Sequence, residues 1–252
     1  MKFIYCFRSE WLKTKGSSAS WLCLIGGFFI PLIYLIVFIV YHKTINDYYP
    51  FFNPWRKHYN ELWQNMAGFL LPMGVILASS LIAQLEYKNN TWKQVHTTPQ
   101  SFTTIFLAKF AVVLFMTFKF FLFFTIGILV SGIIPCLIFD HKFPLGGFPA
   151  YGFLMGSVKI FITCLPILAI QFLISLKFKN FLVGIGIGLL GLIASLIGMS
   201  WKYIYLSPYS YTAMIAFPGV KWNFNIYIYA FVYFLILSGI SYYLYISKKE
   251  KG

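Results

Sequence analysis

The sequence predicts an all-α membrane protein with six membrane-spanning helices, because of its composition, its long apolar runs and the placing of its charges. The chain has 252 residues, of which 60% are hydrophobic and 10% charged, and its mean hydropathy is +0.76. A soluble domain is about 45–50% apolar and ~25% charged, and one this small could not bury so much apolar surface. A soluble enzyme, a disordered chain and a disulfide mini-protein are therefore excluded.

Six stretches are long and apolar enough to cross the hydrocarbon core, which takes about 20 residues. We expect spans at approximately 21–41, 67–85, 104–130, 150–176, 181–200 and 225–246. The third lies in a longer apolar run, which Ser131-Gly132 and Pro135 are expected to end with an outer turn. Dividing that run into two spans would place the two basic termini on opposite sides, so an even number of spans is favoured.

The charge of the chain is +14, from 20 Lys and Arg against 6 Asp and Glu. In a soluble protein this balance would indicate nucleic acid, but cytoplasmic loops of membrane proteins carry an excess of Lys and Arg. With the N-terminus inside, twelve basic residues fall on inner segments and six on outer ones. We therefore expect both termini in the cytoplasm and no nucleic acid partner.

The segment before the first span has the pattern of a short amphipathic helix. Phe3, Phe7 and Trp11 recur every four residues, while Arg8 and Lys13 fall elsewhere on the helical wheel. Such a helix can lie in the inner membrane interface. The alternative is an ordinary basic flank before a membrane anchor.

Two outer segments and one glycine pattern complete the outline. Residues 42–66 are expected to form an outer loop, and their aromatic side chains fit an interfacial belt. Residues 201–224 are either a short helix that dips into the outer leaflet or a surface loop with aromatic anchors. Gly184 and Gly188 form a GxxxG motif in the fifth span, which predicts close helix packing, more readily within one subunit than between two.

The longest inner loop, between the second and third spans, has the pattern of a short cytoplasmic helix. Asn90 or Thr91 can cap a helix that begins near Trp92, and Pro99 is placed as the first residue of the next helix. A partner could grip such a helix, with contacts from Glu86, Trp92, Lys93, Val95 and Lys109. The alternative is a solvated basic loop.

This loop resembles the Glu…Asn-Gly-Thr…Pro…Lys segment of type-2 ABC exporter permeases. The matching residues are Glu86, Asn90, Thr91, Pro99 and Lys109, and Asn90 stands where the family usually has the glycine of Asn-Gly-Thr. In that family the loop is the coupling helix, which docks on the ATP-binding subunit. In its size, the chain most resembles the small permease subunits of bacitracin-resistance and lantibiotic-immunity exporters.

The resemblance implies a single transmembrane permease domain over residues 1–252 in a bacterial cytoplasmic membrane. The chain has no GxxxxGK[ST] motif, so ATP and Mg²⁺ are expected on a separate ATP-binding cassette subunit. The resemblance also implies a second permease subunit, identical or paralogous, and export of an amphipathic peptide antibiotic or lipid-like substrate. The chain itself is then not an enzyme and holds no cofactor.

Lys119 and Lys159 lie within predicted spans, where a charge is costly and marks a functional candidate. We expect them at similar depths in the outer half of a cavity, where they could attract an anionic lipid or a peptide carboxylate. The alternative is that each side chain reaches toward the outer interface.

The alternatives to a permease are a membrane-embedded enzyme, a non-ABC channel, and a sensor or accessory subunit. A membrane-embedded enzyme would need acids, bases or metal ligands, but the predicted spans contain no Asp, Glu or His, and no catalytic or metal site is expected. A non-ABC channel or a sensor or accessory subunit would not need an ATPase. Association with a P-loop protein distinguishes these from a permease.

Overall fold

A computed structural model describes residues 2–42, 54–88, 100–139, 148–178, 180–217 and 224–247, and all regular secondary structure in them is helical. The helices are α1 (Lys2–Thr14), α2 (Ser18–Val40), α4 (Pro54–Asn65), the π-helix η1 (Met66–Leu70), α5 (Leu71–Lys88), α7 (Phe102–Phe139), α8 (Ala150–Lys177), α9 (Phe181–Ile197), the 3₁₀ turns η2 (Gly198–Ser200) and η3 (Ile204–Leu206), α10 (Tyr211–Ala216) and α11 (Ile226–Ser247).

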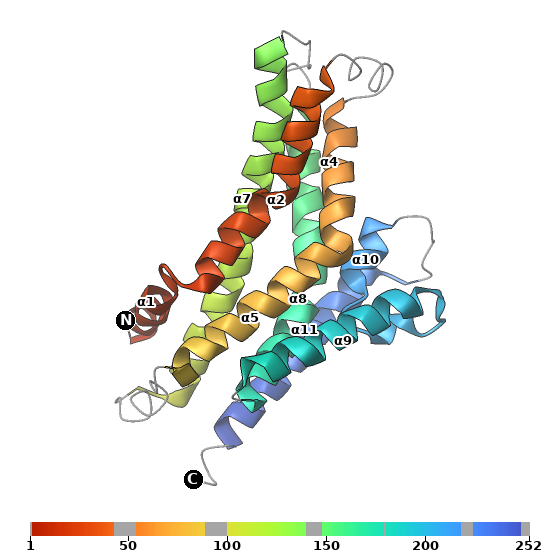
Figure 1. The fold of residues 1–252 in the computed structure, drawn as a ribbon. Helices are drawn as coiled ribbons and strands as arrows, with labels where there is room; N and C mark the ends of the chain where they lie inside the picture. The colour runs from red at the N-terminus through yellow and green to blue at the C-terminus, as the bar shows by residue number, and fades with distance from the viewer. Residues whose placement is uncertain are drawn as a thin grey trace.

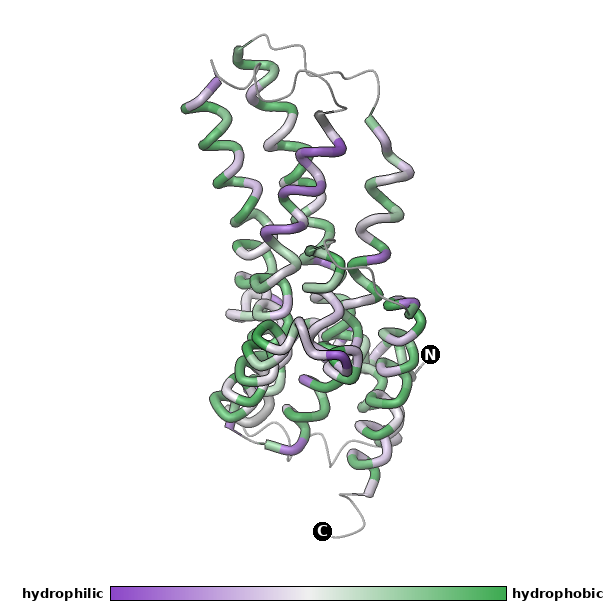
Figure 2. The backbone as a smooth tube through the Cα atoms, turned by 90° about the vertical axis from the view of Figure 1, so that its right-hand side faces the viewer, coloured by the Kyte–Doolittle hydropathy of each residue, from purple (hydrophilic) through white to green (hydrophobic). Residues whose placement is uncertain are grey.

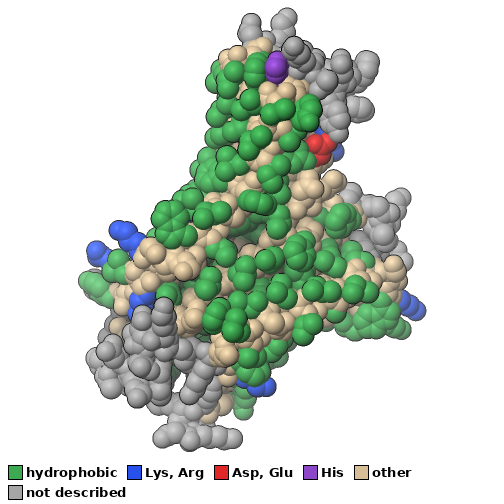
Figure 3. All heavy atoms as spheres, in the orientation of Figure 1, with side chains coloured by type: hydrophobic (Ala, Val, Ile, Leu, Met, Phe, Trp, Pro, Cys, Tyr) green, Lys and Arg blue, Asp and Glu red, His purple; other side chains and the backbone are tan. Residues whose placement is uncertain are grey.

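The structure confirms an all-α membrane protein. Six stretches of the described helices are long and apolar enough to cross a membrane: Ser18–Val40, Trp55–Leu85, Phe102–Phe139, Ala150–Lys177, Phe181–Ser200 and Ile226–Ser247. Hydrophobic side chains cover most of the face in Figure 3, and charged groups gather at its margins. Apolar residues thus face outward as well as inward, as lipid requires.

The helices form two tiers (Figure 1). The upper tier holds α4 and parts of α2, α7 and α8, while α5, α9, α11 and the remaining parts of α7 and α8 form the lower tier. α1 packs against α7 at the side of the lower tier, and α10 lies where the tiers meet.

The second spanning helix begins earlier than expected, because residues predicted as outer loop form α4. Trp55, Tyr59 and Trp63 are buried at i, i+4 and i+8 on one face of this helix, and Trp63 packs on Phe124 with ring centroids 4.5 Å apart. The other residues of α4 are mostly hydrophilic, as Figure 2 shows. The expected aromatic belt is therefore the buried stripe of an amphipathic helix.

α7 continues to Phe139, past the end expected at Val130, as one 38-residue helix that includes Pro135. Packing overrides the local breakers here. A Cβ added at Gly132 would come within 2.7 Å of the Trp55 ring, so the glycine lets α4 approach closely. Ser131 Oγ lies 3.0 Å from His58 Nε2, a second tie between α4 and α7. Proline inside a spanning helix is tolerated when neighbouring helices support it.

Candidate functional site

The predicted coupling loop joins two long helices. α5 ends at Lys88 and α7 begins at Phe102, so any movement of the segment between them acts on both. The predicted contact residues Asn90, Thr91, Trp92, Lys93, Val95 and Pro99 lie outside the described residues, as does the side chain of Glu86. Lys109 is the member of the set whose side chain the structure describes.

Lys109 lines a small cavity of about 40 Å³ between α1, α5, α7 and α8. Its walls include Glu10 and Lys13 of α1, whose Oε1 and Nζ atoms lie 2.6 Å apart. Ser79 of α5 adds a buried hydroxyl that has no hydrogen-bond partner among the described residues. A cavity of this size can hold a few water molecules next to these polar side chains. The first turns of α7 therefore border a pocket in which charged and hydroxyl side chains lie among apolar ones, with α1 on one side.

Glu10 was not singled out from the sequence, although it is only 9% exposed and belongs to this pocket. Its spacing of three residues from Lys13 is the signal that could have identified the pair. Burial raises the pKa of the nearby Cys6 thiol; Glu10 adds to the rise, while Lys13 and Lys109 oppose it. The charges of α1 and α7 thus act on one small region.

α1 is fixed to α7 by aromatic packing. The Trp11 and Phe115 ring centroids lie 4.2 Å apart in an edge-to-face arrangement, and Cys6 packs against Ile105 and Ala108. α1 therefore packs against α7, the helix that follows the predicted coupling loop. Its position relative to a membrane interface stays a prediction.

The two predicted cavity lysines are not brought into one contact. Lys119 Nζ lies 5.6 Å from the Trp11 ring centroid on the α1 side of the molecule, whereas Lys159 Nζ lies 5.8 Å from the Tyr227 ring on α11. Neither forms an ion pair with a described acidic residue. Both ammonium groups are thus held against aromatic faces, which attract cations.

A buried amide joins three elements in the lower tier. Gln171 on α8 donates hydrogen bonds through Nε2 to Ser80 Oγ of α5 at 3.0 Å and to the Gly184 carbonyl of α9 at 2.7 Å. Tyr209, just before α10, donates to Gln171 Oε1 at 3.4 Å. Sequence reasoning did not select Gln171, because a single glutamine in an apolar run has no motif.

The glycines of α9 make this approach possible. A Cβ added at Gly188 would lie 2.6 Å from Gln171 Oε1, and one at Gly191 would lie 2.7 Å from the Tyr209 ring. The predicted close packing along the fifth span is confirmed, and it occurs within the subunit, as small residues in membrane helices allow.

The junction between the tiers contains a π-helical segment, η1, between α4 and α5. π-helical turns are rare and often mark functional sites. A Cβ added at Gly68 would lie 3.1 Å from the Phe217 ring, which follows α10. α10 is itself packed into the protein, because Tyr211 and Ala213 are fully buried. The described part of residues 201–224 thus contains a short buried helix rather than only a surface loop, and its entry into the outer leaflet stays a prediction.

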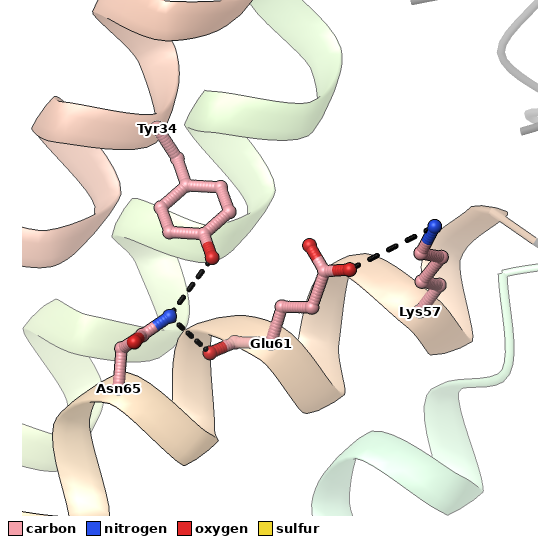
Figure 4. Close-up of polar contacts among 4 residues, drawn as sticks. All are labelled: Tyr34, Lys57, Glu61 and Asn65. Carbon is pink, nitrogen blue, oxygen red and sulfur yellow. Dashed lines mark hydrogen bonds and ion pairs between the residues drawn. The ribbon is translucent and has the colours of Figure 1, made fainter. Parts of the chain in front are cut away.

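The remaining face of α4 is polar. Asn65 donates through Nδ2 to the Tyr34 hydroxyl of α2 at 2.9 Å, and Lys57 Nζ lies 3.9 Å from Glu61 Oε1 along the helix (Figure 4). Arg56 and Asn60 are exposed on this helix. An exposed polar stripe in an otherwise apolar bundle can face water or a hydrated path.

The described residues contain no group of three or more His, Cys, Asp or Glu side chains able to hold a metal ion. One connecting segment joins α5 to α7, a pocket lies between α1, α5, α7 and α8, and the π-helical segment η1 separates the polar α4 from the apolar α5.

These features define a multi-pass α-helical membrane protein. The chain belongs to a known transporter family. The sequence model of the family described as ABC-2 family transporter protein matches residues 6–195, which reach from α1 into α9. No curated protein and no solved structure matches the chain. Family membership makes the chain a membrane permease component of an ABC transporter and implies an ATP-binding subunit as its partner.

Proposed function

We propose that this chain is the permease subunit of an ATP-driven exporter, which moves an amphipathic peptide antibiotic or a lipid-like substrate out of a bacterial cytoplasmic membrane. The observation that supports this proposal most strongly is that the loop expected to dock on the ATPase connects the ends of α5 and α7. These belong to the two longest membrane-spanning stretches in the described structure.

In the proposed cycle, the separate ATP-binding subunit, which would hold ATP and Mg²⁺, closes. Closure pushes the loop that carries Glu86, Asn90, Thr91, Trp92 and Lys93, and the push passes into α5 and α7. Because η1 interrupts the regular α-helix between α5 and α4, α4 can tilt relative to α5. The tilt would open a path along the polar face of α4 to the outside.

The proposed assembly contains two permease subunits, identical or paralogous, and both termini lie in the cytoplasm. Two observations support this orientation: both α5 and α11 end toward the lower part of the molecule in Figure 1, and basic residues are concentrated on the segments assigned to the inside. The second subunit would complete the cavity that α4 borders.

Lys119 and Lys159 are proposed as separate contacts for an anionic group of the substrate or of a membrane lipid. Each ammonium is partly shielded by an aromatic ring and has no described acidic partner. A carboxylate or phosphate on an amphipathic molecule would supply the missing charge.

Reconstitution of the chain with its ATP-binding subunit tests the proposal. Trp92→Ala should lower substrate-stimulated ATP hydrolysis severalfold while the complex stays assembled or weakens. Trp201→Ala is the matched control, because Trp201 is 56% exposed and lies in the segment assigned to the outside. Equal ATP hydrolysis and transport in both variants would contradict the coupling role of the loop.

The lysines are tested separately. Lys119→Ala and Lys159→Ala should each reduce export without loss of protein from the membrane, with Lys202→Ala as the control, since its Nζ lies over Tyr203 in the segment assigned to the outside. Unchanged export in both variants would remove the two lysines from the substrate path and leave the coupling proposal intact.

A further inference from the structure

A crevice of about 330 Å³ lies between the C-terminal turns of α8 and α11. Both helices run to the same end of the molecule (Figure 1). The crevice is lined by Leu173, Leu176 and Lys177 of α8 and by Ser241, Leu244, Tyr245 and Ser247 of α11. Its volume is within the range of pockets that hold small molecules.

The lining changes from apolar to polar along the helices. Leu173 and Leu244 lie about one turn before the helix ends, whereas Lys177 and Ser247 are the final residues of their helices. Ser241 is buried, but its Oγ donates to the Leu237 carbonyl at 2.7 Å, so it needs no polar ligand. An occupant should therefore be apolar along the leucines and polar at the mouth.

The described residues that line the crevice include one charged side chain, Lys177. Lys177 Nζ lies 5.7 Å from the Phe178 ring centroid and forms no ion pair with a described acidic residue. In the sequence, Lys179 follows it closely, and Lys248, Lys249, Glu250 and Lys251 follow the end of α11. Five lysines and one glutamate thus flank the two helix ends in the sequence. Basic sites of this kind between spanning helices favour lipid phosphates.

We propose that this crevice binds an anionic phospholipid, with one acyl chain along Leu173, Leu176 and Leu244 and its phosphate within reach of Lys177. Lipid is the occupant that the surroundings supply, because α8 and α11 are both spanning helices and Leu244 is 45% exposed. The site does not depend on ATP, on the direction of transport or on the exported substrate. Its test can therefore fail without affecting the proposed function.

Lipid retention measures this binding directly. The chain is reconstituted in bilayers with equal amounts of phosphatidylglycerol and phosphatidylcholine, extracted gently, and its bound lipids are counted by native mass spectrometry. The wild-type chain should retain phosphatidylglycerol about tenfold over phosphatidylcholine. Leu173→Trp, which fills the crevice, should lose the bound lipid, and Lys177→Gln should keep a lipid but lose the preference for phosphatidylglycerol.

Two control variants place the same substitutions elsewhere. Leu190→Trp changes a leucine of α9 that is 70% exposed, and Lys202→Gln removes a lysine outside the crevice; both should retain lipid like the wild type. If Leu173→Trp does not fold, Leu244→Trp fills the crevice from α11. Equal retention in the wild type and the filled variants would overturn the proposal. So would a change in oligomeric state or in peptide binding without a change in lipid, because the occupant would then be a second copy or a peptide.

Discussion

Gln171 and Gly184 are joined by a hydrogen bond of 2.7 Å, in which the side-chain amide of α8 donates to a main-chain carbonyl oxygen of α9. The same amide binds Ser80 of α5. Side chains that bond between helices in a membrane contribute modestly each, but here one side chain holds three elements together. The geometry requires glycine on the facing helix, and this requirement can be tested.

Gly188→Ala should destabilise the lower tier by about 1–3 kcal/mol, as overpacking in a close-packed interior does. The added methyl would meet Gln171 Oε1 at 2.6 Å and Ile76 Cγ2 at 2.7 Å. Gly186→Ala is the matched control on the same helix, because nothing lies within 4 Å of its added Cβ. Thermal unfolding of both variants in detergent measures the difference, and an equal melting temperature would contradict the packing described.

Gln171→Ala should weaken the contacts of α8 with both α5 and α9. The buried Ser80 hydroxyl and the Tyr209 hydroxyl each lose a partner, at a cost of about 1–3 kcal/mol per unsatisfied group. Chemical denaturation followed by circular dichroism gives the free energy of unfolding. A double-mutant cycle with Ser80→Ala separates their coupling, which should exceed the coupling of Gln171→Ala with the distant Tyr34→Phe.

Cys6 should report the charges at the pocket beside α1 through its labelling by maleimide, measured against pH in a variant with Cys23, Cys136 and Cys164 replaced by Ala. Glu10 raises the pKa of the Cys6 thiol and Lys13 lowers it. Glu10→Gln should therefore move the labelling profile to lower pH, and Lys13→Gln should move it to higher pH.

The sign of these shifts follows from the reactive species. The thiolate reacts, so a lower pKa yields more thiolate at a given pH. The maximal rate at high pH should stay constant while α1 remains docked. Shifts in the same direction for both variants would contradict the arrangement of charges, and a higher maximal rate would show that α1 had been released.

Gly68→Leu should break the contact between η1 and the Phe217 ring that follows α10. An added Cβ would lie 3.1 Å from the Phe217 ring, so a larger side chain must displace that ring. Gly74→Leu on α5 is the control, because nothing lies within 4 Å of its added Cβ. Protease sensitivity after α10 should rise in the first variant and stay unchanged in the second. Export by the reconstituted complex should fall in Gly68→Leu and stay unchanged in Gly74→Leu.

Much of the fold was predictable because apolar length is a strong signal. Each spanning stretch overlaps one of the expected spans, although two of them extend well beyond the expected bounds. The outer part of the second stretch was missed, because Arg56, Lys57 and Glu61 lower the hydropathy of α4 even though Trp55 and Trp63 have helical spacing. The end of α7 was predicted too early, because Ser131-Gly132 and Pro135 favour a helix end locally. The α4 side chains that pack against this part of α7 cannot be read from the local sequence.

The candidate site was predictable only as sequence motifs. The coupling loop was predicted from its resemblance to a segment of type-2 ABC exporter permeases, and Lys109 is the residue of that set whose side chain is described. The pocket formed by Glu10, Lys13 and Ser79 has no motif, because its members come from separate helices. Side chains far apart in the sequence meet only when the helices pack.

By itself the sequence determined the class of the protein, the number of its spanning stretches and the loop that resembles a coupling helix. These follow from composition and local spacing, which need no tertiary contact. The tertiary structure decided that Trp11 shields Lys119, that Gln171 joins α5, α8 and α9, and that two helix ends enclose a crevice. The physical reason is that such contacts depend on how rigid helices cross, and glycines and buried polar groups set those crossings.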